Sequence, residues 1–312
     1  MAISEFGLIQ QFFTSQSLIN AVNRLGVGDD CALISVPEGQ ELALTVDTMV
    51  EGVHFFSGTD PEQLGRKLLA VNLSDLASMG ATPVSATLAL TLPEVNETWL
   101  KSFSKGFLNL AREFSIDLIG GDTTKGPLTL SVQAMGIVPE GLALKRSTAK
   151  AGDLIFVTGL GLGDAGLGLK IEQGYSSVFS AEVLRKFHLP EPRVAEGIKI
   201  REYASSCIDL SDGIASDLAH ILEQSAVGAC LDWDKIPLSQ AVKDYINATG
   251  DWGLPLSAGE DYELCFSVAP DKVDAIDIDC TQVGVIESKA GLRIKRLNII
   301  EELEVKGFEH FS

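Results

Sequence analysis

Alternating apolar and polar positions predict an ordered series of strands and helices in the first half of the chain. Continuous apolar runs indicate buried strands, whereas leucines at helical spacing indicate amphipathic helices. Gly80 follows the first such helix and predicts its end. The expected elements are strands at 41–49, 84–92, 116–119 and 128–138 and helices at 62–80 and 98–114.

The second half begins after a break in the pattern at 139–152, where proline and glycines punctuate a basic stretch. These signals predict two domains, at 1–140 and 147–312. Strand-to-strand runs occur beside strand–helix alternation, so both halves are expected to be α+β. The expected elements are a strand at 153–158, helices at 163–172, 181–187, 193–204 and 213–225, and a strand-rich part from about 262.

Composition narrows the classes of function. The 312 residues are enough for two domains, and the formal net charge is −19. Such an acidic chain is not expected to bind nucleic acid or an anionic membrane surface, because both require a basic face. The apolar runs are too short for a membrane span. Five cysteines without metal-type spacing, and an N-terminus unlike a signal peptide, predict a cytoplasmic protein.

Five short segments pair aspartate with glycine, serine or threonine. Asp47 is expected to end a strand and Asp122 to follow one through a two-glycine turn, so both should lie at a sheet edge. Carboxylate oxygens are the ligands that Mg²⁺ prefers, commonly together with substrate phosphates. A negatively charged protein that handles phosphates needs such cations. The segments are Gly28–Asp30, Thr45–Thr48, Asn72–Asp75, Gly120–Thr124 and Asp209–Gly213.

A glycine-rich segment at 159–166 resembles a dinucleotide-binding turn, with the G-x-G-x-x-G pattern from Gly161 to Gly166. The acidic residue expected about 20 residues later, at the end of a second strand, is missing, because that region is helical and basic. We therefore interpret the segment as a turn that lets a helix pack closely on a strand, with phosphate contact nearby left open. The sequence also lacks a P-loop.

Three further residues are candidates from their type and place. Arg146 is one of few cations and could bind a phosphate in a bidentate manner, although a solvated linker arginine fits equally. His54 follows Asp47 by seven residues but lies beside phenylalanines, which also fits a packed histidine. Glu260 precedes an apolar strand and could orient a cationic substrate.

Together these segments resemble the thiamine-monophosphate kinase family of the aminoimidazole-ribonucleotide-synthetase-like (PurM-like) superfamily. The resemblance covers nearly the whole chain. It depends on seven short motifs in one order: 27–32, 45–50 with His54-Phe55, 72–81, 120–123, 157–159, 209–213 and 259–264. One departure is Ala258, which stands where the family often has a second glycine before Glu-Asp.

The resemblance implies direct, Mg²⁺-assisted transfer of the ATP γ-phosphoryl group onto thiamine monophosphate by a two-domain PurM-like homodimer, with no phosphoenzyme. It implies ATP contacts from Gly121, Asp122, Arg146 and Ser211, and thiamine contacts from His54, Glu260 and Phe308. No counterpart of the ATP contact near 100–110 is evident. The implied Mg²⁺ ligands are Asp30, Thr45, Asp47, Asp75, Asp122, Asp209 and Asp212, with Val46 contributing through its backbone.

Several alternatives remain open at this stage. Within the superfamily, another ATP-dependent synthetase or cyclo-ligase is the main one, and selenophosphate synthetase is opposed by the lack of a reactive Cys or Lys near the N-terminus. Outside it, an acidic cation-binding protein or a dinucleotide oxidoreductase could be considered. The local Ca²⁺-loop pattern of the former is absent, and the latter depends on the glycine-rich segment alone.

Overall fold

The computed structural model describes residues 5–14 and 18–304 and divides into two compact units. Unit 1 comprises Met1–Leu76 and Ala81–Gly141, and unit 2 comprises Ala77–Gly80 and Leu142–Ser312. Each unit combines helices with a sheet that contains both parallel and antiparallel strands, which confirms the α+β fold class.

Unit 1 is built on a four-stranded sheet in the order β3-β6-β4-β5. The β4–β5 pair is parallel and is connected through α3, whereas β6 is antiparallel to both of its neighbours. A small two-stranded sheet, β1–β2, precedes it. The elements are α1 (Glu5–Phe13), β1 (Asn23–Leu25), β2 (Leu33–Ile34), β3 (Gln40–Val50), α2 (Pro61–Ser78), β4 (Thr82–Leu92), α3 (Glu97–Glu113), β5 (Asp117–Lys125) and β6 (Thr129–Pro139).

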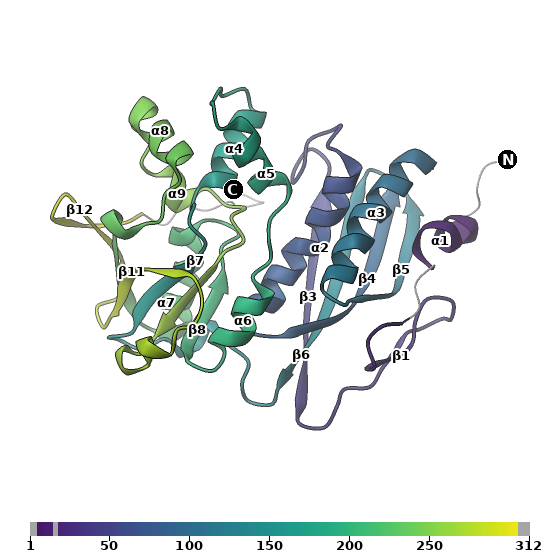
Figure 1. Ribbon diagram of the computed structural model, residues 1–312, viewed down its shortest axis with the longest axis horizontal. Helices are drawn as coiled ribbons and strands as arrows, with labels where there is room; N and C mark the ends of the chain where they lie inside the picture. The colour runs from purple at the N-terminus through teal and green to yellow at the C-terminus, as the bar shows by residue number, and fades with distance from the viewer. Residues whose placement is uncertain (1–4, 15–17, 305–312) are drawn as a thin grey trace. The chain divides into compact units, whose positions relative to one another are not determined.

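Helices α2 and α3 lie on the same side of this sheet (Figure 1). They cross at two glycines where the backbones nearly touch. A Cβ on Gly106 would lie 1.9 Å from the carbonyl oxygen of Glu62, and one on Gly65 would lie 2.2 Å from that of Phe103. Helix α3 starts at Asn96, whose side chain accepts a hydrogen bond from the N–H of Trp99. The helix pair is therefore held by close backbone packing.

Unit 2 is built on a seven-stranded sheet in the order β13-β12-β9-β11-β7-β10-β8. All neighbours are antiparallel except β12 and β9. Helix α7 packs into the main core of this unit through Ile214, Leu218 and Ile221. The elements are η1 (Arg146–Thr148), β7 (Leu154–Thr158), α4 (Asp164–Glu172), α5 (Ser180–His188), α6 (Val194–Ile200), β8 (Ala204–Asp209), α7 (Ile214–Ser225), β9 (Gly228–Asp232), η2 (Trp233–Lys235), α8 (Gln240–Thr249), α9 (Leu254–Ser257), β10 (Leu264–Val268), η3 (Pro270–Ala275), β11 (Cys280–Glu287), β12 (Gly291–Arg296) and β13 (Ile299–Glu302).

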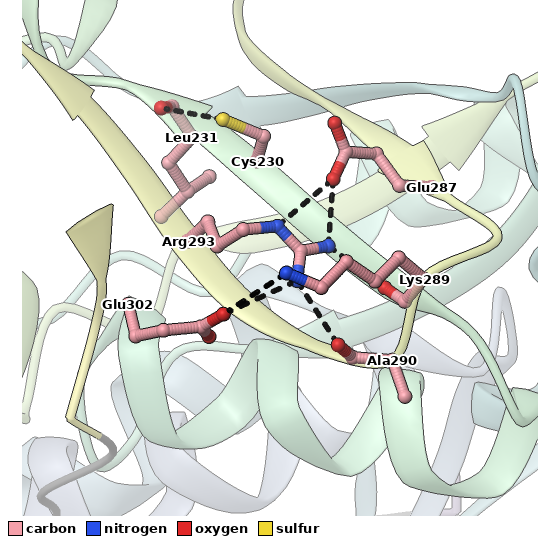
Figure 2. A network of polar contacts seen from close by, with 7 residues as sticks. All are labelled: Cys230, Leu231, Glu287, Lys289, Ala290, Arg293 and Glu302. Carbon is pink, nitrogen blue, oxygen red and sulfur yellow. Dashed lines mark hydrogen bonds and ion pairs between the residues drawn. The ribbon is translucent and has the colours of Figure 1, made fainter. Parts of the chain in front are cut away.

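A buried arginine fixes the turn between β11 and β12 (Figure 2). Arg293 donates two hydrogen bonds to one oxygen of Glu287, at 3.1 and 2.6 Å, and others to the carbonyl oxygens of Lys289 and Ala290. Glu302 on β13 lies 3.7 Å from the same guanidinium. One side chain thus joins the turn to the edge of the sheet.

Three expectations from the sequence differ from the structure. Gly120–Asp122 is not a turn, because β5 continues through it to Lys125. The helix expected at 193–204 ends at Ile200, and residues from Ala204 form β8. Asp47 lies within β3, three residues before its end. Within the described ranges, no helix is long and apolar enough to cross a membrane.

We expect Arg293→Gln to lower the free energy of unfolding by about 1–3 kcal/mol, because the turn would lose most of the hydrogen bonds that the buried guanidinium donates to it. Lys289→Gln is the matched control. Its ammonium group is largely exposed and lies 3.4 Å from Glu302, so about 0.5 kcal/mol or less is expected. Chemical denaturation measures both, and equal losses would contradict the importance assigned to Arg293.

Candidate functional site

One group of candidate ligands lies on the helix-covered face of the unit 1 sheet. The hydroxyl of Thr45 on β3 donates a hydrogen bond to the carboxylate of Asp75 on α2. Asp47 is two residues further along β3, and residues two apart in a strand point to the same face. Thr45, Asp47 and Asp75 therefore present oxygen atoms between β3 and α2.

Asp122 points to the opposite face of the same sheet. Asp47 on β3 pairs with Val132 on β6, which pairs with Leu88 on β4. Leu88 in turn pairs with Gly121 on β5, so these four residues form one row across the sheet. Asp122 belongs to the next row, and adjacent rows face opposite ways. The two aspartates are also on the two edge strands, which three strand spacings place about 14 Å apart. Both aspartates therefore lie on edge strands, but neither lies at a strand end as predicted, and unit 1 does not bring them together.

Gly121 has a local structural reason to be glycine. A Cβ there would lie 1.9 Å from the carbonyl oxygen of Leu88 on the neighbouring strand. Replacing it would push β5 away from β4 and displace Asp122. This packing explains the glycine without requiring a nucleotide contact.

The segment that carries Asp30 is attached to β5 by a buried carboxylate. Asp117 accepts hydrogen bonds from the N–H groups of Ile19 and Asn20, at 2.6 and 2.8 Å, and from the amide of Asn23 at 2.7 Å. Asp30 is exposed in the connection between β1 and β2. Its backbone N–H donates to the side chain of Asp29 at 2.9 Å.

His54 lies in a tight turn that follows β3. The N–H of Val50 donates to its Nδ1 at 3.1 Å, and the N–H of His54 donates to the carbonyl oxygen of Val50 at 3.0 Å. Because Nδ1 accepts a hydrogen bond, Nε2 carries the proton of the neutral ring. The turn thus fixes the tautomer, with the proton on Nε2.

Unit 2 gathers three aspartates at the end of β8 and the start of α7. Asp209 is buried at the strand end, and Asp217 is buried on the first turns of the helix. The N–H of Asp212 donates to the carboxylate of Asp217 at 3.0 Å. Burial raises the pKa of Asp217 to about 8; the hydrogen bond from Asp212 opposes this, and the charges of Asp209 and Asp212 add to it.

Arg146 faces this acidic group. Its guanidinium lowers the pKa of Asp217, the opposite of the effect of the neighbouring carboxylates. The backbone of η1 is held to α7 because the hydroxyl of Ser225 donates to the carbonyl oxygen of Arg146 at 2.7 Å and accepts from the N–H of Ala149 at 3.1 Å. Arg146 is thus an exposed cation on a segment fixed to α7.

The loop that carries Glu260 lies directly against Ser211. The N–H of Glu260 donates to the carbonyl oxygen of Ser211 at 2.8 Å, and the N–H of Tyr262 donates to that of Leu210 at 2.8 Å. A Cβ on Gly259 would lie 2.1 Å from the Ser211 oxygen. Two segments about 50 residues apart in sequence, with predicted roles toward ATP and toward the substrate, are therefore neighbours in unit 2.

The glycine-rich segment at 159–166 serves close packing, although the helix start packs against α9 and Ala258 and not against a strand as predicted. A Cβ on Gly163 would lie 2.8 Å from Cα of Pro255, and one on Gly166 would lie 2.2 Å from Cβ of Ala258. A Cβ on Gly159 would lie 2.3 Å from a carboxylate oxygen of Glu263. The glycines allow the start of α4 to contact the segment that leads into the Glu260 loop.

The oxygen donors on β3, α2 and the β8–α7 turn are those that suit Mg²⁺. Among residues 5–14 and 18–304, however, no group of three or more His, Cys, Asp or Glu side chains is close enough to hold a metal ion. The single convergent pocket expected from the sequence is therefore not formed within either unit. Phe308, the predicted aromatic contact, lies outside the described residues.

Three buried charged residues on or next to elements that carry candidate ligands were not predicted from the sequence. They are Asp117, Asp217 and Lys67. Lys67 lies on α2 and is only 4% exposed. Lys67 lies eight residues before Asp75 within an otherwise leucine-rich helix face. A lone charge among leucines was the available signal, since such residues are rarely buried without a partner.

Comparison with known proteins identifies the family. Residues 28–138 match the model for AIR synthase related protein, N-terminal domain. Over the full chain, the thiamine-monophosphate kinases of Salmonella typhimurium and Escherichia coli K12 are 44% and 45% identical, covering 100% of this chain and 99% of theirs. The chain belongs to the thiamine-monophosphate kinase family.

Solved structures of the thiamine-monophosphate kinase family share the fold. The crystal structure from Stenotrophomonas maltophilia K279a has a TM-score of 0.85 and 40% identity, over 94% of this chain and 97% of that one. AaThiL, solved in complex with AMPPCP and TMP, has a TM-score of 0.80 and 28% identity, over 99% of this chain and 97% of that one. These matches confirm the predicted PurM-like fold.

The raised pKa of Asp217 predicts a pH dependence of stability. A folded-state pKa of about 8, against an ordinary value of 3.8, means that the folded protein retains a proton that the unfolded chain loses. The resulting stabilisation is complete below about pH 4 and is lost as the pH rises to about 8, by up to ~1.4 kcal/mol per pH unit. Asp217→Asn removes this contribution.

Chemical denaturation with EDTA between pH 5 and pH 9 measures it. The free energy of unfolding of the unsubstituted protein should fall relative to that of Asp217→Asn as the pH rises. Asp244→Asn, at an exposed position on α8, should leave the pH dependence unchanged. Parallel curves for the unsubstituted protein and Asp217→Asn would contradict the assignment.

Proposed function

We propose that this chain transfers the γ-phosphoryl group of ATP directly to thiamine monophosphate, giving thiamine diphosphate and ADP in the last step of thiamine diphosphate synthesis. Family membership makes it an ATP-dependent kinase of thiamine monophosphate. Support comes from the full-length identity with enzymes named thiamine-monophosphate kinase and from the AaThiL complex with AMPPCP and TMP.

The observation in this chain that carries the proposal is the hydrogen bond from the N–H of Glu260 to the carbonyl oxygen of Ser211. It supports an arrangement in which a residue assigned to the nucleotide and one assigned to the acceptor share one rigid corner of unit 2. Reacting groups held side by side need little further organisation before transfer.

The chemistry requires charge control more than covalent help. An oxygen of the acceptor phosphate forms a bond to the γ-phosphorus while the bond from that phosphorus to the β-phosphate oxygen breaks, so ADP leaves and the protein is never phosphorylated. The acceptor oxygen is already ionised near neutral pH, so no strong base is needed. Positioning and neutralisation of negative charge carry such reactions.

The proposed nucleotide contacts are Gly121, Asp122, Arg146 and Ser211. Arg146 would neutralise phosphate charge, because it is an exposed guanidinium on a segment fixed to α7. The proposed thiamine contacts are His54, Glu260 and Phe308. His54 would donate through Nε2, and Glu260 would face the cationic ring.

Mg²⁺ is proposed as the cofactor, in several copies. When bound, it supplies positive charge between donor and acceptor phosphates. Hard oxygen donors at all the assigned positions fit this ion. Thr45 and Asp75 already contact each other, so they are pre-oriented toward one site. The proposed ligands are Asp30, Thr45, the Val46 backbone, Asp47, Asp75, Asp122, Asp209 and Asp212.

A cytoplasmic homodimer is the proposed form. The sheet face that carries Asp122 exposes apolar side chains on β3, since Leu44 is 56% and Val46 is 63% exposed. Apolar side chains on a sheet face are normally covered by another layer. A second copy would cover them and would lie beside Asp122. The N-terminal domain would then supply metal sites and the dimer contact, and the C-terminal domain would complete the ATP and substrate sites.

We expect Asp47→Asn and Asp122→Asn each to reduce turnover by at least about a hundredfold, as for loss of an essential charge at a phosphoryl-transfer site. The fold should be retained, as judged by circular dichroism. Glu41→Gln is the matched control: it removes an exposed carboxylate from the start of the same β3 strand and should leave turnover unchanged. Thiamine diphosphate and ADP are measured together at saturating Mg²⁺.

The same assay tests the ligase alternative. ADP release that depends on thiamine monophosphate, with equal thiamine diphosphate formed, supports the kinase. ADP release without thiamine diphosphate would indicate a synthetase or cyclo-ligase. Normal turnover by either aspartate variant would contradict the metal roles.

Leu44→Glu is expected to convert the dimer to a monomer, because a charge would be placed in the buried contact. Sedimentation analysis measures the change in mass. Glu38→Gln, at an exposed position before β3, serves as the control and should remain dimeric. A monomeric unsubstituted protein would reject the dimer outright.

A further inference from the structure

The start of helix α4 holds a carboxylate from a distant part of the chain. Asp261 accepts hydrogen bonds from the N–H of Gly163 at 2.8 Å and from the N–H of Ala165 at 3.3 Å. These are free N–H groups of the first helical turn, the position at which a glycine-rich turn would otherwise bind a phosphate. The residue at the helix cap, Gly163, has no side chain to fill this role. Asp261 therefore occupies the anion position of the glycine-rich segment.

The residues on both sides of Asp261 have unfavourable backbone conformations. Glu260 has φ +75° and Tyr262 has φ +49°, and neither is glycine. The left-handed conformation is unfavourable for residues other than glycine, so surrounding contacts must hold it. On the β8 side, the N–H groups of Glu260 and Tyr262 bind the carbonyl oxygens of Ser211 and Leu210. On the α4 side, Asp261 makes its two hydrogen bonds.

The end of the loop is fixed by a separate set of contacts. Glu263 forms two hydrogen bonds with Arg193, at 2.7 and 2.6 Å, and accepts another from the hydroxyl of Thr158 at 2.6 Å. This network anchors the beginning of β10 whether or not Asp261 is present. The side chain of Asp261 therefore supplies the contacts on the α4 side that hold the centre of the loop, where Glu260 lies.

We propose that Asp261 is a positioning residue for thiamine monophosphate: by capping α4 it holds Glu260 in the left-handed conformation that directs its carboxylate to the cationic ring. This inference depends on the proposed function, specifically on contact between Glu260 and the thiamine part. Asp261 itself contacts no substrate. Its effect should therefore appear in the binding of the acceptor and only through Glu260.

Asparagine at position 261 is the informative substitution. Its single carbonyl oxygen can accept one of the two N–H groups, whereas its NH₂ group would face the other donor. The loop would lose one of its two hydrogen bonds to the start of α4 while the side chain keeps its volume. We expect the KM for thiamine monophosphate to rise roughly tenfold and the KM for ATP to change by less than about twofold.

The test is a double-mutant cycle with Asp261→Asn, Glu260→Gln and the combined variant, each measured with varied thiamine monophosphate and with varied ATP. If Asp261 acts through Glu260, Asp261→Asn should raise the acceptor KM in the unsubstituted protein and have no further effect in Glu260→Gln. Asp251→Asn is the control: it makes the same chemical change at a carboxylate that accepts a hydrogen bond from Tyr245 elsewhere in unit 2, and it should change neither KM.

Additive effects in the cycle, or equal increases of both KM values, would overturn the positioning role and leave the kinase function standing. An unchanged acceptor KM in Glu260→Gln would reject the role of Glu260 and this inference with it. Absence of thiamine diphosphate formation by the unsubstituted protein would instead reject the proposed function. If Asp261→Asn does not fold, Asp261→Ser, which keeps one acceptor oxygen, replaces it in the same cycle.

Discussion

The alternation of side chains across a β-sheet decides which of the acidic residues in unit 1 can act together. Because successive residues face opposite ways, Thr45 and Asp47 share a face with Asp75, whereas Asp122 belongs to the other face. Charged groups separated by a packed sheet cannot bind one ion from within that unit. Elements outside the sheet must therefore complete at least one of the two sets, and a second copy over the face that carries Asp122 would be one such element.

Unit 2 illustrates how a familiar pattern can be used for a different purpose. The segment at 159–166 has the glycines and the helix start of a phosphate-binding turn, yet the chain fills the anion position with its own Asp261. In both cases the N–H groups at the helix start donate hydrogen bonds to oxygen atoms. Here these hydrogen bonds join two loops of the protein, so they stabilise the site without contributing a ligand contact.

Local patterns predicted much of the fold. The helix at 98–114 was expected from its spacing and is observed at Glu97–Glu113, because its one-sided pattern and the Asn96 cap agree. Predictions failed where long-range pairing decides the structure. β5 extends through Gly120–Asp122, where it pairs with β4. The short strand β8, which pairs with β10, was not predicted, and its first residue fell within the helix expected at 193–204.

The candidate site was predictable by residue type but not by arrangement. Sequence motifs indicated Ser211 and Glu260 separately, and only the structure shows that their backbones touch. The neighbouring Asp217 and Asp261 are single acidic residues with no distinctive sequence motif around them. The hydrogen bonds that they accept from the N–H groups of Asp212 and Gly163 cannot be predicted from residue spacing. The role of a buried acidic residue depends on its neighbours in the folded structure, which the sequence alone does not show.

The crossing of α2 and α3 has a consequence for how this protein can vary. Because Gly65 and Gly106 bring main chain against main chain, the helix that carries Asp75 has almost no freedom to slide or rotate. A single methyl group added at this crossing would displace α2 as a rigid body, including its far end. Substitutions among relatives should therefore be tolerated more readily on the outer surfaces of the two helices than at Gly65 and Gly106.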